Sequence, residues 1–289
     1  TAKGLKERGY DVYTTARKEA DVEKLKTEGF HCLQLDYADS KSVQRCADDL
    51  QNLIGVTLYG VFHNGAYGQP GAVEDLTRET LEKQFAANVF GWMELNNRLI
   101  PQMRANNSGR IIFNSSVLGL VSLPFRGAYN ASKYAIEGFA DTLRLELSDT
   151  AIKISLIEPG PIESRFRPNA LQALESNVDM QASVHNKRYE KTLKRLAKVG
   201  HTDPFTLGPE AVLEKVILAL EKEGKIKVSP NVSGAIDNLI ENGLANLGGY
   251  HDRKPLFKHR RTGKYMTQDL KLLLYYHNHL MGYDIERRV

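Results

Sequence analysis

Residues 110–160 read RIIFNSSVLGLVSLPFRGAYNASKYAIEGFADTLRLELSDTAIKISLIEPG. Two short apolar runs, at 110–116 and 153–160, flank a stretch whose apolar residues recur at helical spacing. This order predicts a strand, then a helix, then a second strand. Because a helical crossover joins parallel neighbours, the stretch predicts a parallel sheet covered by helices.

The same alternation extends towards the start of the chain. Apolar runs at 11–16, 30–36 and 58–65 are predicted strands, and helical spacing is found at 40–54 and 78–103. Strands separated by helices favour a doubly wound α/β fold, with helices on both faces of a mostly parallel sheet. In such folds, ligands bind beyond the carboxyl ends of the strands.

Composition narrows the class of protein. Of the 289 residues, 26% are charged and 42% are hydrophobic, as in a soluble globular protein, and the net charge of +4 calls for no nucleic-acid partner. Cys32 and Cys46 lie among apolar or helical positions, which argues against a disulfide framework and favours a reducing, cytoplasmic setting. No apolar run approaches the roughly 20 residues that span a bilayer.

Polar or small residues follow each predicted strand, at the edge where this fold binds ligands. Any one such group is weak evidence because loops are polar in general, whereas five in succession form a signal. The groups are Arg17-Lys18, Asp36-Tyr37, Asn64-Gly65-Ala66, Ser115-Ser116 and Pro159-Gly160-Pro161.

Tyr129 and Lys133 lie four residues apart in the predicted helix. Four residues is about one turn, so the two side chains share a face and their polar ends can meet. An isolated pair of this kind is more often surface decoration, and the surrounding motifs have to decide between the two interpretations.

Those motifs resemble the short-chain dehydrogenase/reductase family, NAD(P)-dependent enzymes with a Rossmann fold, over residues 1 to about 228. The motifs are Y-N-A-S-K at 129–133, a serine thirteen residues earlier at 116, A-N-V-F-G at 87–91 and E-P-G-P-I at 158–162. The stretches HNGAYGQPGAVEDL and GPIESRF are most similar to bacterial carbonyl and aldehyde reductases related to retinol and hydroxysteroid dehydrogenases.

The resemblance implies a role for each motif residue. Tyr129 would be the general acid that protonates a carbonyl oxygen as hydride arrives, or the base in the reverse direction. Lys133, with the positive nicotinamide ring of the oxidised cofactor, would bring the phenol pKa down from near 10 towards neutral. Ser116 would hydrogen-bond the carbonyl oxygen. Asn88 would anchor a water molecule that links Lys133 to solvent.

Cofactor choice follows from the TTARK sequence at 14–18. Dinucleotide folds place an acid here for a ribose 2′-hydroxyl, or an Arg for a 2′-phosphate, so Arg17 favours NADP(H) over NAD(H). Two ordinary surface cations remain the alternative. The resemblance implies that Ser164 meets the nicotinamide amide. The other cofactor-binding residues that we expect are Asp36, Tyr37, Asn64, Gly65, Ala66, Lys133, Pro159, Gly160 and Ile162.

The chain also departs from the family pattern. His63-Asn64-Gly65-Ala66 replaces N-N-A-G, and we expect His63 to be a packing residue. The family's first strand and its T-G-x-x-x-G-x-G loop would precede Thr1, and an amino-terminally incomplete copy is expected. Without that strand, a gap should separate the strand ending at Ala16 from the strand ending at His63. Activity is then expected of an intact form.

The domain organisation predicted is a Rossmann-like domain over 1–230 and a basic extension of unknown fold over 231–289. Residues 165–207 would cover a small carbonyl or alcohol substrate, with Leu171, Leu174 and Met180 either lining a pocket or packing in the core. In the extension, His277 and His279 are spaced badly for a metal, and no metal site is expected.

Three other functions stay open: a non-catalytic binding or regulatory protein of this fold, an inactive truncated copy, and a surface role for the basic extension. The extension could meet phosphate or acidic lipid, or be a solvated tail. A homo-oligomer is also compatible with the sequence.

Overall fold

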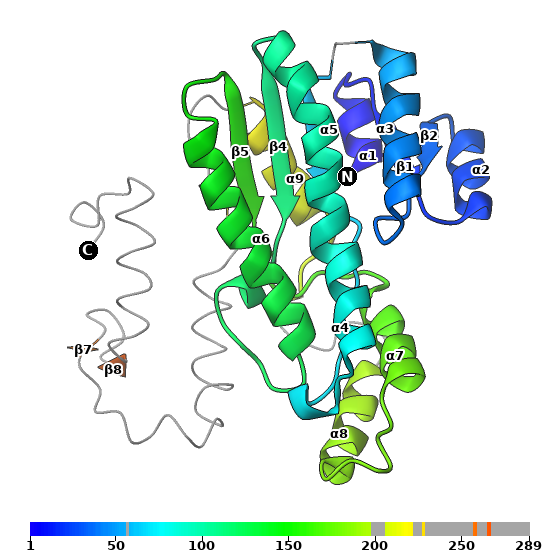
Figure 1. Cartoon of the computed structure of the whole chain (residues 1–289), viewed down its shortest axis with the longest axis vertical. Coiled ribbons are helices and arrows are strands. Elements are labelled where there is room, and N and C mark those ends of the chain that lie inside the picture. The colour runs from blue at the N-terminus through cyan, green and yellow to red at the C-terminus, as the bar shows by residue number, and fades with distance from the viewer. Residues whose placement is uncertain (56–57, 198–205, 222–226, 229–256, 259–264, 267–289) are drawn as a thin grey trace. The chain divides into compact units, whose positions relative to one another are not determined.

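The computed structural model describes residues 1–55, 58–197, 206–221, 227–228, 257–258 and 265–266 (Figure 1). The chain divides into two units, Thr1–Ile236 and Asp237–Val289. In the second unit, the described residues form an antiparallel pair, β7 (Phe257–Lys258) with β8 (Tyr265–Met266). The rest of the basic extension, with His277 and His279, lies outside the described residues.

The first unit alternates strands and helices in the predicted order. Its strands are β1 (Tyr13–Ala16), β2 (His31–Gln34), β3 (Gly60–His63), β4 (Gly109–Asn114), β5 (Ile152–Ile157) and β6 (Lys227–Val228). Its α-helices are α1 (Ala2–Glu7), α2 (Glu19–Thr27), α3 (Ser40–Ile54), α4 (Arg78–Phe85), α5 (Gly91–Ala105), α6 (Gly127–Glu146), α7 (Phe166–Asn177), α8 (Asn186–Leu196) and α9 (Glu210–Glu221). Short turns η1 (Val73–Asp75), η2 (Ala86–Phe90) and η3 (Val117–Gly119) complete the described elements.

Every strand pair in this unit is parallel, which confirms the predicted doubly wound α/β arrangement. One sheet has the order β3-β4-β5-β6, and β1 and β2 form a separate pair. Within the described residues, β1 and β3 are not hydrogen-bonded neighbours, so the predicted gap between these two strands is confirmed.

The core lies on both faces of the larger sheet because side chains of β4 alternate in direction. Ile111 and Phe113 are fully buried against α5 and α6, whereas Ile112 packs on the opposite side against α1 and α9. In Figure 1, α5 and α6 lie in front of β4 and β5, with α9 behind them. A strand buried on both faces explains the continuous apolar run of its sequence.

The single helix predicted over 78–103 is interrupted by a π-helical turn. Helix α4 runs into η2, a π turn, and then into α5. Such turns occur often at functional sites, and this one carries Asn88 at its centre with a fully buried side chain.

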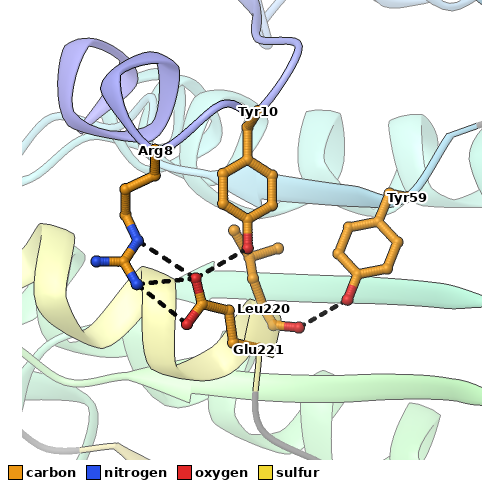
Figure 2. A network of polar contacts seen from close by, with 5 residues as sticks. All are labelled: Arg8, Tyr10, Tyr59, Leu220 and Glu221. Carbon is orange, nitrogen blue, oxygen red and sulfur yellow. Dashed lines mark hydrogen bonds and ion pairs between the residues drawn. The ribbon is translucent and has the colours of Figure 1, made fainter.

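The amino-terminal elements are attached to the rest of the unit through α9 (Figure 2). Arg8 forms a two-pronged ion pair with Glu221, with nitrogen–oxygen distances of 3.1 and 3.3 Å, and the Tyr10 hydroxyl donates to the same carboxylate at 3.2 Å. Tyr59, just before β3, donates to the carbonyl of Leu220 at 2.8 Å. The segments that lead into β1 and β3 are thus both fastened to α9.

Two further sequence expectations can be checked here. Cys32 and Cys46 are both buried free thiols, so they form no disulfide. No described helix is long and apolar enough to cross a membrane.

Candidate active site

Tyr129 lies in the first turn of α6 and is almost completely buried, with 9% of its surface exposed. The ring of Phe166 packs edge-on against it, with 5.2 Å between the ring centroids. Burial raises the pKa of the Tyr129 phenol to about 12, while a hydrogen bond from Ser116 and the charge of Arg126 act in the opposite direction. At neutral pH the phenol is therefore protonated and can donate a proton.

Ser116 reaches Tyr129 from the loop that follows β4. Its backbone is extended, and its Oγ accepts a hydrogen bond from the Leu118 backbone N–H at 3.1 Å. This local bond caps the short turn η3 and holds the serine hydroxyl in one place. A strand end and a helix start, distant in sequence, thus bring two hydroxyl groups into contact.

Lys133 lies one turn after Tyr129 and is 2% exposed. Its Nζ donates to the Asn114 backbone carbonyl at 2.7 Å and lies 4.7 Å from the centroid of the Trp92 ring. Burial lowers the pKa of Lys133 to about 7, against the opposing effect of the Glu137 carboxylate. The ammonium lies 5.6 Å from the Tyr129 ring centroid, yet the cation that lowers the Tyr129 pKa is Arg126.

Asn88 joins the π turn to the next loop and to α6. Its Oδ1 accepts from the Tyr67 backbone N–H at 3.1 Å, and its Nδ2 donates to the Tyr67 carbonyl at 2.9 Å. The same Nδ2 donates to Ser132 Oγ at 3.2 Å. These bonds use the whole amide group, so Asn88 fixes the loop beside the site; no contact with Lys133 is found among the described residues.

The carboxyl ends of β3 and β4 meet at a polar edge next to Lys133. Asn114 Nδ2 donates to Asn64 Oδ1 at 2.7 Å, and the Trp92 ring nitrogen donates to the Gly65 carbonyl at 3.0 Å. Asn114 Oδ1 is buried and has no hydrogen-bond partner among the described residues. An unpaired acceptor beside a buried ammonium fits the amide of a nicotinamide ring.

The end of β5 borders the same edge. The Pro159 carbonyl accepts from the Val117 N–H at 3.1 Å, which ties this turn to the Ser116 loop. Ile162 forms a bridge with Leu207, and the exposed Ser164 accepts from the Phe166 N–H at 3.3 Å. Gly160 and Ala66 are half-buried small residues close to this edge in sequence.

Tyr37 has a packing role that the sequence did not indicate. Its hydroxyl hydrogen-bonds to His63 Nδ1 at 3.1 Å, and burial raises the pKa of the phenol. Gly91 leaves no room for a side chain because a Cβ there would lie 2.1 Å from the Tyr37 carbonyl oxygen. His63 is fully buried and stacked on Phe113, and burial lowers its pKa to about 4, which agrees with the packing role expected for it.

Asp36 and Arg17 lie on the separate β1–β2 side. One Asp36 carboxylate oxygen accepts from the Ala38 N–H at 2.9 Å and shapes the turn after β2. Arg17 follows β1 directly and is exposed; its carbonyl accepts from Gln34 at 3.2 Å. Within the described residues, its guanidinium group forms no hydrogen bond or ion pair.

The covering region contributes core as well as surface. Leu174 is fully buried in an apolar cluster with Ala170 and Tyr189, and Leu171 and Met180 pack against that cluster. Of the two roles expected for Leu174, a pocket or the core, the structure therefore shows packing in the core.

Three residues at the site were not predicted from the sequence: Asn114, Arg126 and Phe166. Arg126 stands three residues before Tyr129, and this helical spacing could have indicated a shared face. Phe166 and Asn114 reach the site only through the fold and carry no such signal.

Comparison with known proteins agrees with this fold. The family model described as short chain dehydrogenase matches residues 1–175. The uncharacterized oxidoreductase YbbO of Escherichia coli strain K12 is 42% identical over 212 residues, which cover 73% of this chain and 72% of that protein. The chain therefore belongs to the short-chain dehydrogenase/reductase family, and it is an NAD(P)-dependent oxidoreductase.

More distant relatives are similar over most of their length. The 3-ketodihydrosphingosine reductase of Bacteroides thetaiotaomicron is 33% identical over 239 residues, 80% of this chain and 83% of that protein. Among solved structures, the closed form of serine dehydrogenase complexed with NADP+ superimposes with a TM-score of 0.66 at 19% identity. The superposition covers 79% of this chain and 87% of the serine dehydrogenase chain. At such low identity, the similarity shows a shared fold and nothing more.

Proposed function

We propose that this oxidoreductase transfers a hydride between NADP(H) and a carbonyl or alcohol substrate, reducing an aldehyde or ketone or acting in reverse. The observation that carries the proposal is that Ser116 lies close enough to the buried Tyr129 phenol to lower its pKa, with the Lys133 Nζ 5.6 Å from the Tyr129 ring centroid. The group lies at the carboxyl ends of parallel strands, where this fold binds its ligands.

Tyr129 is the proton donor in the reducing direction. Its pKa of about 12 keeps the phenol protonated at neutral pH, and Ser116 lies against its hydroxyl. A carbonyl oxygen that accepts from both hydroxyls is held and polarised, and the phenol proton passes to that oxygen as negative charge develops. The bound cofactor supplies the hydride.

Lys133 and Asn114 hold the nicotinamide end. Lys133 Nζ donates to the Asn114 carbonyl, and the unpaired Asn114 Oδ1 would be available to a donor on the bound cofactor. Lys133 also stabilises the phenolate that remains after proton transfer. We assign further cofactor contacts to residues that follow β3 and β5 in the sequence: Asn64, Gly65, Ala66, Pro159, Gly160, Ile162 and Ser164.

Asn88 acts by positioning. It secures the Tyr67 backbone and Ser132, one residue before Lys133, so the loop after β3 keeps its distance from α6. A water molecule bound near this amide would complete the path from Lys133 to solvent that the family resemblance implies.

Arg17 selects NADP(H). It is an exposed cation at the carboxyl end of β1, and it lacks an intramolecular partner among the described residues. A 2′-phosphate would meet this guanidinium, with the Asp36-Tyr37 turn at the end of the neighbouring strand β2. We assign all of these roles to residues 1–230.

The gap between β1 and β3 favours one alternative, a binding protein of this fold without turnover. The two functions differ in one property, since only the enzyme oxidises NADPH when a carbonyl compound is added.

The test uses the protein expressed from its whole gene. Quenching of tryptophan fluorescence, to which the buried Trp92 contributes, would report NADPH binding, and the loss of NADPH absorbance after addition of octanal would report turnover. Binding together with octanal-dependent oxidation supports the proposal. If the protein binds NADPH but no aldehyde or ketone in a panel oxidises it, the result would support the alternative, a binding protein without turnover.

A further inference from the structure

Three arginines lie close enough to one another to interact electrostatically, and one of them, Arg126, also acts on Tyr129. Arg126 immediately precedes α6, Arg167 lies in the first turn of α7, and Arg195 lies in the last turn of α8. Apolar neighbours of all three pack into one buried cluster, which contains Ala128, Ala170 and Leu196. The three side chains therefore start from the same part of the molecule.

Arg126 is held within this region by its backbone. The preceding residue, Phe125, adopts a left-handed backbone angle of φ 61°, which is rare for a bulky side chain. The Phe125 ring is anchored edge-on against Tyr189, with 5.0 Å between centroids, and its carbonyl accepts from the Gly71 N–H at 3.2 Å. This strained conformation is kept in place by packing on both sides.

One nitrogen atom of the Arg126 guanidinium lacks a hydrogen-bond partner among the described residues. This atom, Nη1, is buried. A buried cation without an acceptor is costly, and native proteins retain such groups where a ligand completes the interaction.

Like charges surround this guanidinium. Burial lowers the pKa of Arg126, and the positive charges of Arg195 and Arg167 lower it further. The pKa of Arg195 is lowered by burial and by Arg167. Each of the three cations is thus close enough to raise the cost of charging another, and a bound anion would relieve this repulsion.

The cluster is adjacent to the reacting groups. The charge of Arg126 lowers the pKa of Tyr129, and Phe166, the neighbour of Arg167, packs edge-on against the Tyr129 ring. A molecule whose carbonyl oxygen meets Tyr129 would extend towards the arginines along the partly buried Phe125 and Leu171 side chains.

We propose that Arg126, Arg167 and Arg195 bind an anionic oxygen group of the substrate, so that this enzyme acts on carbonyl compounds carrying a carboxylate or a phosphate. The inference rests on the proposed function of Tyr129 for the identity of the ligand as a substrate. Arginine suits both groups because its planar fork can donate two parallel hydrogen bonds.

Equilibrium binding tests the anion site without any need for turnover. Octanoate, octyl phosphate and the neutral octanamide are titrated calorimetrically into the protein expressed from its whole gene, at fixed low ionic strength. We expect at least one anion to bind roughly ten- to a hundredfold more tightly than octanamide, as for a charge-assisted contact. Preference for octanoate or for octyl phosphate identifies the group.

Variants locate the site. Arg126→Gln and Arg195→Gln should each remove most of the preference, and Arg126→Lys should retain part of it because the charge remains without the fork. Lys194→Gln removes the same charge from an exposed position beside Arg195 on α8 and should leave the preference unchanged. Part of Arg195 lies in solvent although its charged group is desolvated, so its replacement tests the cluster even if Arg126→Gln does not fold.

Equal or undetectable binding of anions and amide by the wild-type protein would overturn the inference, as would a preference that survives both glutamine variants. The same protein is assayed for octanal-dependent NADPH oxidation. Oxidation without an anion preference would leave the proposed function standing and remove the anion site. An anion preference without oxidation of NADPH by any carbonyl compound would leave the anion site standing and remove the proposed function.

Discussion

The surroundings of Tyr129 and those of Arg17 differ in almost every physical property. Tyr129 and Lys133 are buried, and their pKa values are moved to about 12 and about 7. Arg17 is exposed to solvent on the separate β1–β2 pair. The comparison teaches that the residues proposed for the chemical step are buried, whereas the residue proposed to select the cofactor is an exposed cation.

The sheet explains this difference. β4 has a hydrogen-bonded neighbour on each side, and helices cover both of its faces, so the residues after it are held rigidly. Among the described strands, β1 pairs with β2 alone. The segment before β1 is bound by Arg8 and Tyr10 to the exposed Glu221. Substitutions in the first region should therefore have larger effects.

The largest expected effect is that of Tyr129→Phe in the protein expressed from its whole gene. Removal of the proton donor should lower the turnover number by about 10²–10⁴-fold, the usual contribution of general acid–base catalysis, with NADPH affinity changed only a few-fold. Tyr134→Phe, at a 40% exposed position of the same helix, is the matched control. Steady-state kinetics measure both, and a loss below tenfold for Tyr129→Phe would count against its role as the acid.

Lys133→Met should change how stability depends on pH. The folded pKa of about 7 lies below the ordinary 10.5, so between these values the unfolded chain binds the extra proton and stability rises with pH. From pH 7 to pH 9 the native lysine should add about 2 kcal/mol to the free energy of unfolding. Urea titrations at both pH values measure it. The methionine variant should lack this rise, and equal pH dependence in the two proteins would mean that the Lys133 pKa is not lowered.

Arg17→Asp tests the exposed region. A charge-assisted contact with the 2′-phosphate contributes roughly 1.5–3 kcal/mol, so NADPH binding should weaken at least about tenfold. NADH, which lacks the phosphate, should bind as before or more tightly if the new carboxylate reaches the ribose. Titrations of both nucleotides at fixed ionic strength decide, because salt screens an exposed contact. Equal weakening of both would assign Arg17 a structural role.

The smallest expected effect is that of Glu221→Gln, which removes the carboxylate charge bound by Arg8 and Tyr10. An exposed ion pair contributes about 0.2–1 kcal/mol, and salt should reduce the difference. Faster amide hydrogen exchange in β1 and β2, with little change in β4, is the expected result. Glu82→Gln, which breaks the exposed pair with Arg78 on α4, should leave exchange in β1 and β2 unaltered.

The amino-acid sequence by itself determined the order of strands and helices, because their apolar residues recur with local periods. The α3 boundaries at Ser40 and Ile54 agree with the helical spacing at 40–54. The sequence also determined that Tyr129 and Lys133 share a helix face, since the spacing of one turn is a local property. The family pattern also predicted that β1 and β3 would not be hydrogen-bonded neighbours, as found among the described strands.

Only the tertiary structure decided the electrostatics of the site. The pKa values of Tyr129 and Lys133 are set mainly by burial, which depends on segments far away in the sequence. Tyr37 is predicted to bind the cofactor, and only the tertiary structure places its hydroxyl against His63. The convergence of Arg126 with arginines about forty and seventy residues later has no local signature, because a helical or strand period relates only near neighbours.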